Sequence, residues 1–186
     1  ALEVGYPVAL KMISSRLAHK TEAGAVALNL QDQDSLNRAA EKMRIDVAAY
    51  DAKAISELFL VESMSASPLA ELIINMRQDP QFGAALVLGS GGVLVELLAD
   101  SVTLLLPTRP VEIIRAIKSL QVGRLLEGFR GRPAADIPKL AEEIYKLSIA
   151  FQEDIKSIAE IEINPLFVYQ TEVTAIDALI QVSNNE

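Results

Sequence analysis

Residues 162–177 read Glu-Ile-Asn-Pro-Leu-Phe-Val-Tyr-Gln-Thr-Glu-Val-Thr-Ala-Ile-Asp, with apolar residues on both sides of Gln170-Thr171. A two-residue turn at that pair would close a β-hairpin, and counting outward from it places Asn164 directly opposite Asp177. Directly opposed residues have Cβ atoms about 4.5–5.5 Å apart. The sequence therefore predicts a hairpin that brings an amide and a carboxylate together.

Glu162 belongs with this pair, because residues two apart on a strand face the same side. A carboxylate, an amide oxygen and a second carboxylate are hard oxygen ligands of the kind that Mg²⁺ prefers. Asp177 also lies in an otherwise apolar strand, where a lone charge is costly without a partner. The alternative is that Glu160, Glu162 and Asn164 form the solvated face of an edge strand and that Asp177 pairs with a lysine. The spacing alone leaves both interpretations open.

The composition indicates an ordinary folded protein and argues against several classes of function. The chain has 186 residues, 51% of them hydrophobic and 23% charged, and a formal net charge of −8 at pH 7. This charge argues against general nucleic-acid binding. The chain has no cysteine, which excludes disulfides and zinc–cysteine sites and fits a cytoplasmic location. The most apolar stretch, Ala84–Ala99, is interrupted by glycines and is too short for a membrane span.

Hydrophobic patterning predicts an α+β fold with mixed or antiparallel sheets and packed helices. The expected strands cover Pro7–Ile13, Gly24–Leu30, Leu58–Met64, Leu69–Arg77, Ala84–Leu88, Val93–Leu98 and Val102–Leu106, before the closing hairpin. The expected helices cover Ser35–Met43, Pro110–Leu120 and a segment that Asp136 caps and that runs to Gln152, with a loop over Gly123–Pro133. Two lobes are expected, residues 1–60 and residues 61–186.

Lys11 is the only polar residue in the apolar run Pro7–Ile13. An ammonium group loses its hydration when it is buried, so a lysine is normally avoided in such a strand. Either its long stem reaches solvent at the edge of the sheet, or the ammonium group is aimed at a phosphate oxygen. The position of Lys11 leaves both interpretations open.

The connection after this strand carries the single histidine, His19, next to Lys20 and shortly before Gly24. A loop of this composition can cover a polyphosphate, with backbone N–H groups as donors. A lone loop histidine is more often simply solvated. Glu62 and Glu71 lie in expected strands, where exposure to solvent is the simpler interpretation.

Six short motifs follow one another along the chain. They are Gly5-Tyr6-Pro7-Val8-Ala9-Leu10-Lys11, His19-Lys20-Thr21-Glu22-Ala23-Gly24, Asp79-Pro80-Gln81-Phe82-Gly83, Gly89-Ser90-Gly91-Gly92-Val93-Leu94-Val95-Glu96, Leu126-Glu127-Gly128-Phe129-Arg130-Gly131 and Glu162-Ile163-Asn164-Pro165-Leu166. Together they resemble the ATP-grasp domain of NDP-forming acyl-CoA synthetases, the ADP-forming acetate–CoA ligase family that is related to succinyl-CoA synthetase β subunits. The resemblance covers essentially the whole chain, and six motifs in order are specific although each alone is weak.

This resemblance implies an ATP-grasp fold, in which two α+β lobes hold a nucleotide between them. It also implies the reaction acyl-CoA + ADP + phosphate ⇌ carboxylic acid + CoA + ATP, through an acyl phosphate and a phosphohistidine. The implied cofactors are Mg²⁺ and ATP or ADP. The acid that reacts and the choice between ATP and GTP stay open, as do the roles of Arg130 and Arg132.

The resemblance further implies roles for individual residues. Lys11 and Lys20 would bind nucleotide phosphates, and the loop that ends at Gly24 would cover them. Glu62 would contact the adenine and ribose. The remaining expected roles are Mg²⁺ ligation by Asn164 and Asp177 with Glu162 adjacent, nucleotide binding by Glu71, and transient phosphoryl transfer to His19.

Two departures from the family pattern limit what the chain is expected to do. The chain has Gly24-Ala25 where the family often has two consecutive glycines. The family's ATP-grasp domain normally begins some tens of residues before the Gly5-Tyr6-Pro7-Val8 strand, so the resemblance implies that the first lobe is cut and that the CoA-binding and ligase domains lie outside this sequence. We therefore expect an incomplete first lobe and a fragment that needs those domains, or a subunit carrying them, within an oligomeric enzyme.

Two other classes of function are alternatives to a synthetase part. One is a ligand-sensing domain fused to a protein acetyltransferase, which would keep the fold without the catalysis. The other is an acidic oligomerisation or scaffolding domain, which would account for neither Lys11 nor Asp177.

Overall fold

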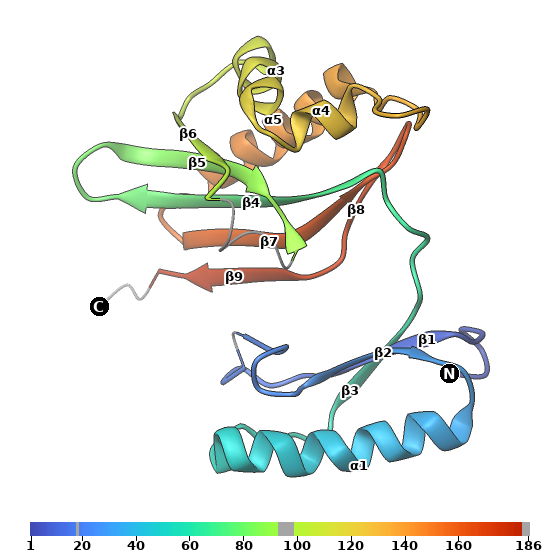
Figure 1. Ribbon diagram of the computed structural model, residues 1–186. Coiled ribbons are helices and arrows are strands. Elements are labelled where there is room, and N and C mark those ends of the chain that lie inside the picture. Colours follow the sequence, from blue (N-terminus) through green and yellow to red (C-terminus); the bar gives the residue numbers. More distant parts are fainter. Residues whose placement is uncertain (18, 93–98, 184–186) are drawn as a thin grey trace. The chain divides into compact units, whose positions relative to one another are not determined.

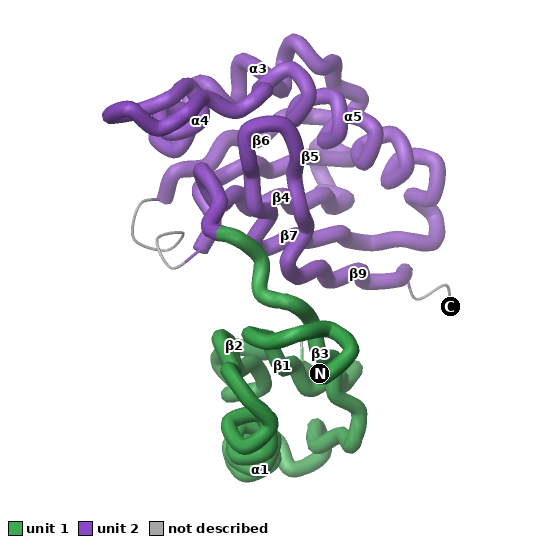
Figure 2. Tube along the Cα trace, turned by 90° about the vertical axis from the view of Figure 1, so that its right-hand side faces the viewer, with its two compact units in different colours: residues 1–66 green, residues 67–186 purple. Residues whose placement is uncertain are grey.

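The computed structural model describes residues 1–17, 19–92 and 99–183 and separates the chain into two compact units, Ala1–Ala66 and Ser67–Glu186 (Figure 1; Figure 2). Each unit has its own hydrophobic core. The expected division after residue 60 falls inside strand β3 (Phe59–Ser63), which pairs along its whole length with β1 (Val8–Met12). Because β3 completes the sheet of unit 1, the chain leaves this unit only after Ala66.

Unit 1 is a three-stranded antiparallel sheet, in the order β2-β1-β3, with one long helix packed on it (Figure 1). Leu10 and Met12 of β1 share a core with Val47 of the helix. The elements in chain order are β1 (Val8–Met12), β2 (Val26–Leu30), α1 (Gln33–Tyr50), the 3-10 helix η1 (Ala52–Ala54) and β3 (Phe59–Ser63). The three strands and the helix predicted for this region are confirmed.

Helix α1 is longer than the predicted Ser35–Met43. Its start is fixed by a capping box, in which the Asp32 carboxylate accepts a hydrogen bond from the Ser35 N–H at 2.7 Å. The Ser35 hydroxyl group in turn accepts one from the Asp32 N–H at 3.1 Å. Val47, four residues beyond the predicted end, is fully buried and extends the apolar side of the helix by another turn.

Unit 2 is built on a six-stranded sheet in which all pairings between the described strands are antiparallel (Figure 1). The strand order is β6-β5-β4-β7-β8, and β9 pairs with the earlier part of β7. The elements are β4 (Ala70–Asp79), β5 (Gly83–Ser90), β6 (Ser101–Leu105), α3 (Pro110–Ser119), α4 (Gly123–Leu126), α5 (Ile137–Glu153), β7 (Ile158–Val168), β8 (Val173–Ala175) and β9 (Ala178–Val182). The predicted α+β class with antiparallel sheets is confirmed.

Two elements of unit 2 differ from the prediction, and a third predicted element cannot be compared with the structure. Strand β5 continues through Gly89 to Ser90, because Gly89 still pairs with Ile73 of β4. The short helix α4 occupies the start of the predicted loop Gly123–Pro133. The strand predicted over Val93–Leu98 lies outside the described residues, and β6 pairs with β5.

Helices α3, α4 and α5 cover one face of this sheet (Figure 1). That face carries Leu72 and Met76 of β4, which share a core with Ile144 of α5. Pro110 is the first residue of α3, and Asp136 caps α5 through the Lys139 N–H, as predicted. No helix in the described ranges combines the length and apolarity that a membrane span requires.

Strand β7 carries a β-bulge at Asn164-Pro165. Leu166 lies opposite Leu72 of β4 and Ile163 lies opposite Ile74, so β7 has one more residue than β4 between these pairs. Ile163 and Leu166 therefore both face the helices, although they are three residues apart. The even-numbered residues before the bulge face the other side of the sheet.

Hydrogen bonds to Asp100 connect the end of β5 to the segment between α3 and α4. Its carboxylate accepts hydrogen bonds from the Ser90 hydroxyl group at 2.5 Å and from the N–H groups of Gln121 and Val122 at 3.0 and 3.3 Å. Burial opposes ionisation of this carboxyl group, but the three hydrogen bonds outweigh burial and hold its pKa below the ordinary value of 3.8. The ionised form of Asp100 therefore stabilises the folded unit.

We predict that Asp100→Asn lowers the free energy of unfolding at pH 7 by about 1 kcal/mol, a modest amount because solvent screens a partly exposed group. A carboxyl group whose pKa is lowered by folding adds stability above its unfolded pKa, and that stability is lost as the pH falls through the folded pKa. The gap between wild type and Asp100→Asn should therefore be full at pH 7 and shrink below about pH 4. Urea unfolding at pH 7 and below about pH 4 measures this difference in the free energy of unfolding, and Asp154→Asn serves as an exposed control. A difference that stays the same in acid would contradict the role assigned to the ionised Asp100.

Candidate functional site

The residues selected from the sequence are divided between the two units. Unit 1 contains Lys11, His19, Lys20, Gly24 and Glu62, and unit 2 contains Glu71, Glu162, Asn164 and Asp177. The functional roles of both sets stay predictions.

Lys11 lies on the central strand of unit 1 and forms an ion pair with Glu62. Its residue exposure is 6%, and its Nζ atom is 2.8 Å from Oε2 of Glu62 on β3. Glu62 lies opposite Ala9, two residues before Lys11 on β1, so the pair is a diagonal contact between neighbouring strands. The Lys11 ammonium group is therefore paired with a carboxylate instead of being exposed to bulk solvent. Lys11 and Glu62, which were both predicted to bind the nucleotide, thus contact each other.

The loop that carries His19 and Lys20 ends in a tight helical turn. The Gly24 N–H donates to the Thr21 carbonyl at 3.1 Å, and the Ala25 N–H donates to the Lys20 carbonyl at 2.8 Å. This pair of bonds is a Schellman motif, and Gly24 occupies its left-handed position with φ of +68°. Since both N–H groups donate within the turn, donors to a phosphate would have to come from earlier in it. His19 is exposed on this turn.

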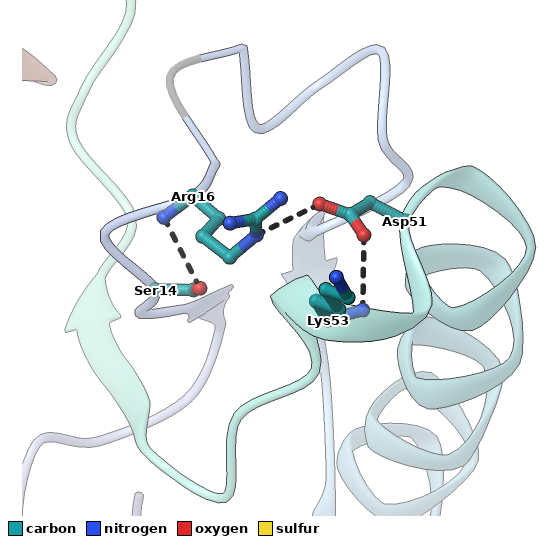
Figure 3. A network of polar contacts seen from close by, with 4 residues as sticks. All are labelled: Ser14, Arg16, Asp51 and Lys53. Carbon is teal, nitrogen blue, oxygen red and sulfur yellow. Dashed lines mark hydrogen bonds and ion pairs between the residues drawn. The ribbon is translucent and has the colours of Figure 1, made fainter.

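An ion pair ties the first part of this loop to the end of α1 (Figure 3). Nε of Arg16 donates to Oδ2 of Asp51 at 2.9 Å, and Oδ1 of Asp51 accepts from the Lys53 N–H at 2.9 Å. The Lys53 N–H and the Arg16 guanidinium together lower the pKa of the Asp51 carboxyl group. The Arg16 N–H lies 3.4 Å from the Ser14 hydroxyl oxygen. This network holds the start of the loop on the helix.

In unit 2, the closing hairpin has the register predicted from its turn. Val168 lies opposite Val173 and Leu166 opposite Ala175. One step further, the Asn164 N–H donates to the Asp177 carbonyl at 3.1 Å, so these two residues are cross-strand neighbours. This pairing places an amide group and a carboxylate side by side on the sheet, and both residues are half-buried.

Asn75 is a buried polar neighbour of the predicted ligand Glu162, and the sequence reasoning missed it. It lies on β4 opposite Glu162, is only 9% exposed, and its Nδ2 donates to Oε1 of Glu160 at 2.5 Å and to Oε2 of Glu162 at 3.3 Å. One sequence signal was available, because Asn75 interrupts the apolar stretch Leu72–Met76. Its partners were not readable, since they are 85 and 87 residues away.

Glu71 lies at the start of β4 beside the glycine pair that follows β5. The Gly91 N–H donates to the Glu71 carbonyl at 2.7 Å. A Cβ atom added to Gly92 would overlap the Glu71 carboxylate, and Gly92 has φ of +72°. Glycine is therefore required at position 92 by both space and backbone conformation, and it leaves room for the Glu71 carboxylate.

A metal ion at the hairpin would have few protein carboxylates. Across residues 1–17, 19–92 and 99–183, no three histidine, aspartate or glutamate side chains are grouped to hold a metal ion. The predicted set consists of Asn164, Asp177 and Glu162, which is two carboxylates and one amide. Mg²⁺ is commonly bound through one or two carboxylates, with water and substrate phosphates completing its octahedron. The donor chemistry of the hairpin fits a nucleotide-bound Mg²⁺ better than an ion held by protein alone.

The sequence pattern of the ATP-grasp domain matches residues 1–182. The chain belongs to the ATP-grasp family. It is 33% identical over 177 residues to the ADP-forming acetate–CoA ligase I subunit beta of Pyrococcus furiosus, covering 95% of this chain and 75% of that protein. It is 36% identical over 171 residues to the ADP-forming 4-hydroxybutyrate–CoA ligase of Nitrosopumilus maritimus, covering 91% of this chain and 24% of that protein. The predicted family is confirmed.

Solved structures of a related ATP-grasp protein have the same fold. Acetyl-coenzyme A synthetase 1 of Ca. Korarchaeum cryptofilum, in complex with coenzyme A, Ca-AMPCP and HgCl⁺, superimposes with a TM-score of 0.87 at 31% identity, covering 98% of this chain and 79% of that chain. The same synthetase in complex with coenzyme A and Mg-AMPPCP gives a TM-score of 0.78 at 28% identity, with the same two coverages. The ATP-grasp chain described here thus spans three quarters of one curated relative and about a quarter of another.

We predict that Glu62→Gln destabilises unit 1 because it leaves the buried Lys11 ammonium group without its carboxylate partner. The expected cost is about 1–2 kcal/mol, less than for a fully buried pair because the Glu62 side chain is 41% exposed. In a Lys11→Met background the same substitution should cost almost nothing. Urea unfolding followed by circular dichroism closes this double-mutant cycle, and equal costs in both backgrounds would disprove the coupling.

We also predict that Gly24→Ala is more destabilising than Gly5→Ala. Both glycines have positive φ, +68° and +85°, so both substitutions strain the backbone. Only at Gly24 would the new Cβ meet a neighbour, 2.7 Å from Cβ of Asp46, whereas Gly5 has open space. Thermal unfolding of the two variants separates the steric cost from the backbone cost. Equal melting temperatures would show that the turn moves freely away from α1.

Proposed function

We propose that this chain is the nucleotide-binding part of an NDP-forming acyl-CoA synthetase, which interconverts acyl-CoA, ADP and phosphate with a carboxylic acid, CoA and ATP. The observation that carries the proposal is the Asn164–Asp177 pair in the register of the hairpin, within a chain that matches the ATP-grasp family over residues 1–182. The names of the relatives support it, because both are ADP-forming acid–CoA ligases.

The proposed ligand is a nucleotide with its Mg²⁺ ion. Related structures contain the nucleotide analogues Ca-AMPCP and Mg-AMPPCP, which supports this choice. Asn164 and Asp177 would hold the ion, with Glu162 beside them. When bound, Mg²⁺ neutralises phosphate charge, which is the main requirement of phosphoryl transfer besides positioning.

Unit 1 would supply the cation that binds the phosphates. Lys11 is held in place by Glu62, and its fixed ammonium group would orient a phosphate oxygen without a large loss of side-chain entropy. The turn that ends at Gly24 would place Lys20 and His19 near the same phosphates. His19 is exposed on that turn, where a phosphoryl group can reach its ring, and Glu62 and Glu71 would be further nucleotide contacts.

The proposed partners are CoA-binding and ligase domains, on the same polypeptide or on a second subunit, in the cytoplasm. Relatives of both arrangements support this: one is named a subunit beta, and in the other the matching segment is a quarter of the protein. Their acids differ, acetate in one and 4-hydroxybutyrate in the other. Acid selection is therefore assigned to the partner domains rather than to this chain.

We predict that titration calorimetry detects ADP binding that is strengthened by Mg²⁺, and that Asn164→Ala combined with Asp177→Ala removes the strengthening. The physical reason is that Asn164 and Asp177 would hold the ion, and the ion would supply positive charge for the phosphates, so without their side-chain oxygens Mg²⁺ would no longer strengthen ADP binding to the chain. Lys11→Met should weaken ADP binding with and without Mg²⁺, since its charge acts on the phosphates directly.

The matched control is Asp34→Ala combined with Asn37→Ala, which removes the same two residue types from the exposed side of α1. This control should bind Mg-ADP like the wild-type chain. Mg²⁺-dependent binding that survives the Asn164 and Asp177 substitutions would refute the metal assignment. A chain that binds no nucleotide under any condition would refute the proposed function as a whole.

A further inference from the structure

Asn75 connects two glutamates on the polar face of unit 2 although it was not selected as a site residue. It lies at the centre of β4, directly opposite Glu162 of β7. Its Nδ2 donates to Glu160 at 2.5 Å and to Glu162 at 3.3 Å. One amide nitrogen therefore bridges two carboxylates that stand two residues apart on the neighbouring strand.

The orientation of this amide is decided by the carboxylates. Oδ1 of Asn75 is buried and, within the described part of the chain, accepts no hydrogen bond. Turning the amide by 180° would not help, because it would bring this oxygen against the Glu160 and Glu162 oxygens instead of the two N–H donors. A buried polar atom without a partner is unfavourable. The two hydrogen bonds to the glutamates therefore determine the orientation of the amide group, although they leave its oxygen without a donor.

The two glutamates project side by side from one strand. Residues two apart on a strand are separated by roughly 7 Å, and both side chains project from the same face. The Asn75 side-chain nitrogen donates to both carboxylates, so its amide group joins the two side chains across the gap between them. The bridge thus fixes the position of both carboxylates relative to β4.

This bridge is next to the proposed Mg²⁺ ligands. Glu162 stands two residues before Asn164, and Asn164 lies opposite Asp177. Since Asn75 contacts Glu162 but belongs to a different strand, β4 has a direct hydrogen-bonded connection to the hairpin face. Hydrogen bonds of this kind to carboxylates beside a metal are a general way to orient them.

We propose that Asn75 is a positioning residue that holds the Glu162 carboxylate in a fixed orientation beside the Mg²⁺ of the bound nucleotide. The proposal rests on the proposed function, because it assumes a metal–nucleotide complex at Asn164 and Asp177. Asn75 acts through Glu162 and does not itself contact the nucleotide. A purely structural role would affect stability without changing how binding depends on metal.

The test compares Asn75→Leu with Thr103→Leu in the full 186-residue chain. Leucine has the same branched arrangement of four side-chain heavy atoms as asparagine but no N–H donor. Thr103 lies opposite Val87, which lies opposite Asn75, so the control places leucine on the same face two strands away from the site. Asn75→Ala is a second variant that removes the amide without adding apolar bulk, in case Asn75→Leu does not fold.

Calorimetry gives the ADP affinity without metal and its increase with Mg²⁺, and the electron paramagnetic resonance signal of Mn²⁺ reports the metal in the ADP complex. Both Asn75 variants should need roughly ten- to a hundredfold more metal for the same ADP binding, the usual loss when a residue that orients a ligand is removed. Their metal-free ADP affinity should stay within twofold of wild type. Thr103→Leu should match wild type in both measurements.

The outcomes separate this proposal from the function on which it rests. If wild type binds Mg-ADP and the folded Asn75 variants show the wild-type metal dependence, the positioning role is overturned and the function stands. If metal-free and metal-dependent binding fall equally, Asn75 has only a structural role and the proposal is again overturned. If wild type shows no metal-dependent ADP binding, the proposed function fails and the positioning role fails with it.

Discussion

The antiparallel pairing of β4 with β7 is the constraint on which unit 2 depends. It joins segments more than 80 residues apart, and its two faces have opposite roles. One face carries Leu72 and Ile163 into the core under the helices, and the other carries Asn75, Glu160 and Glu162. At the bulge at Asn164-Pro165, the alternation of β7 side chains between the two faces shifts by one residue, and the strand stays paired with β4 on both sides of it. A one-residue slip without that bulge would turn the glutamates into the core, where unpaired charges are costly.

In each unit, a buried polar side chain bonds to residues that are distant in sequence. Lys11 meets Glu62 on the neighbouring strand, and Asn75 meets two glutamates across the ladder. Leaving Oδ1 of Asn75 without a donor costs about 1–3 kcal/mol, which is a sizeable fraction of a domain's stability. Such a cost is compatible with folding because the core on the opposite face is extensive, and it is the kind of cost that functional sites retain.

The parts of this structure that could be predicted from sequence are the ones set by local rules. A two-residue turn fixes the hairpin register by counting, so the opposition of Asn164 and Asp177 followed from Gln170-Thr171. Proline at the first helical position predicted the start of α3, and the Asp136 cap predicted the start of α5, because both signals depend on a few consecutive residues. The end of α1 was missed because it depends on burial of Val47 against β1, and the Asn75 bridge because it depends on long-range strand register. The Arg16–Asp51 ion pair was missed for the same reason, because its two residues are 35 positions apart in the sequence.

The division of labour between this chain and its proposed partners follows from the chemistry that its residues can perform. Phosphoryl transfer requires charge neutralisation and alignment more than a protein nucleophile. Each unit offers side chains that suit these requirements: unit 1 has a lysine held by an ion pair, and unit 2 has neighbouring amide and carboxylate groups, which we propose bind the nucleotide and its cation. None of these groups distinguishes one carboxylic acid from another. Two relatives named for different acids match this chain over most of its length, which supports the proposal that the acid is selected elsewhere.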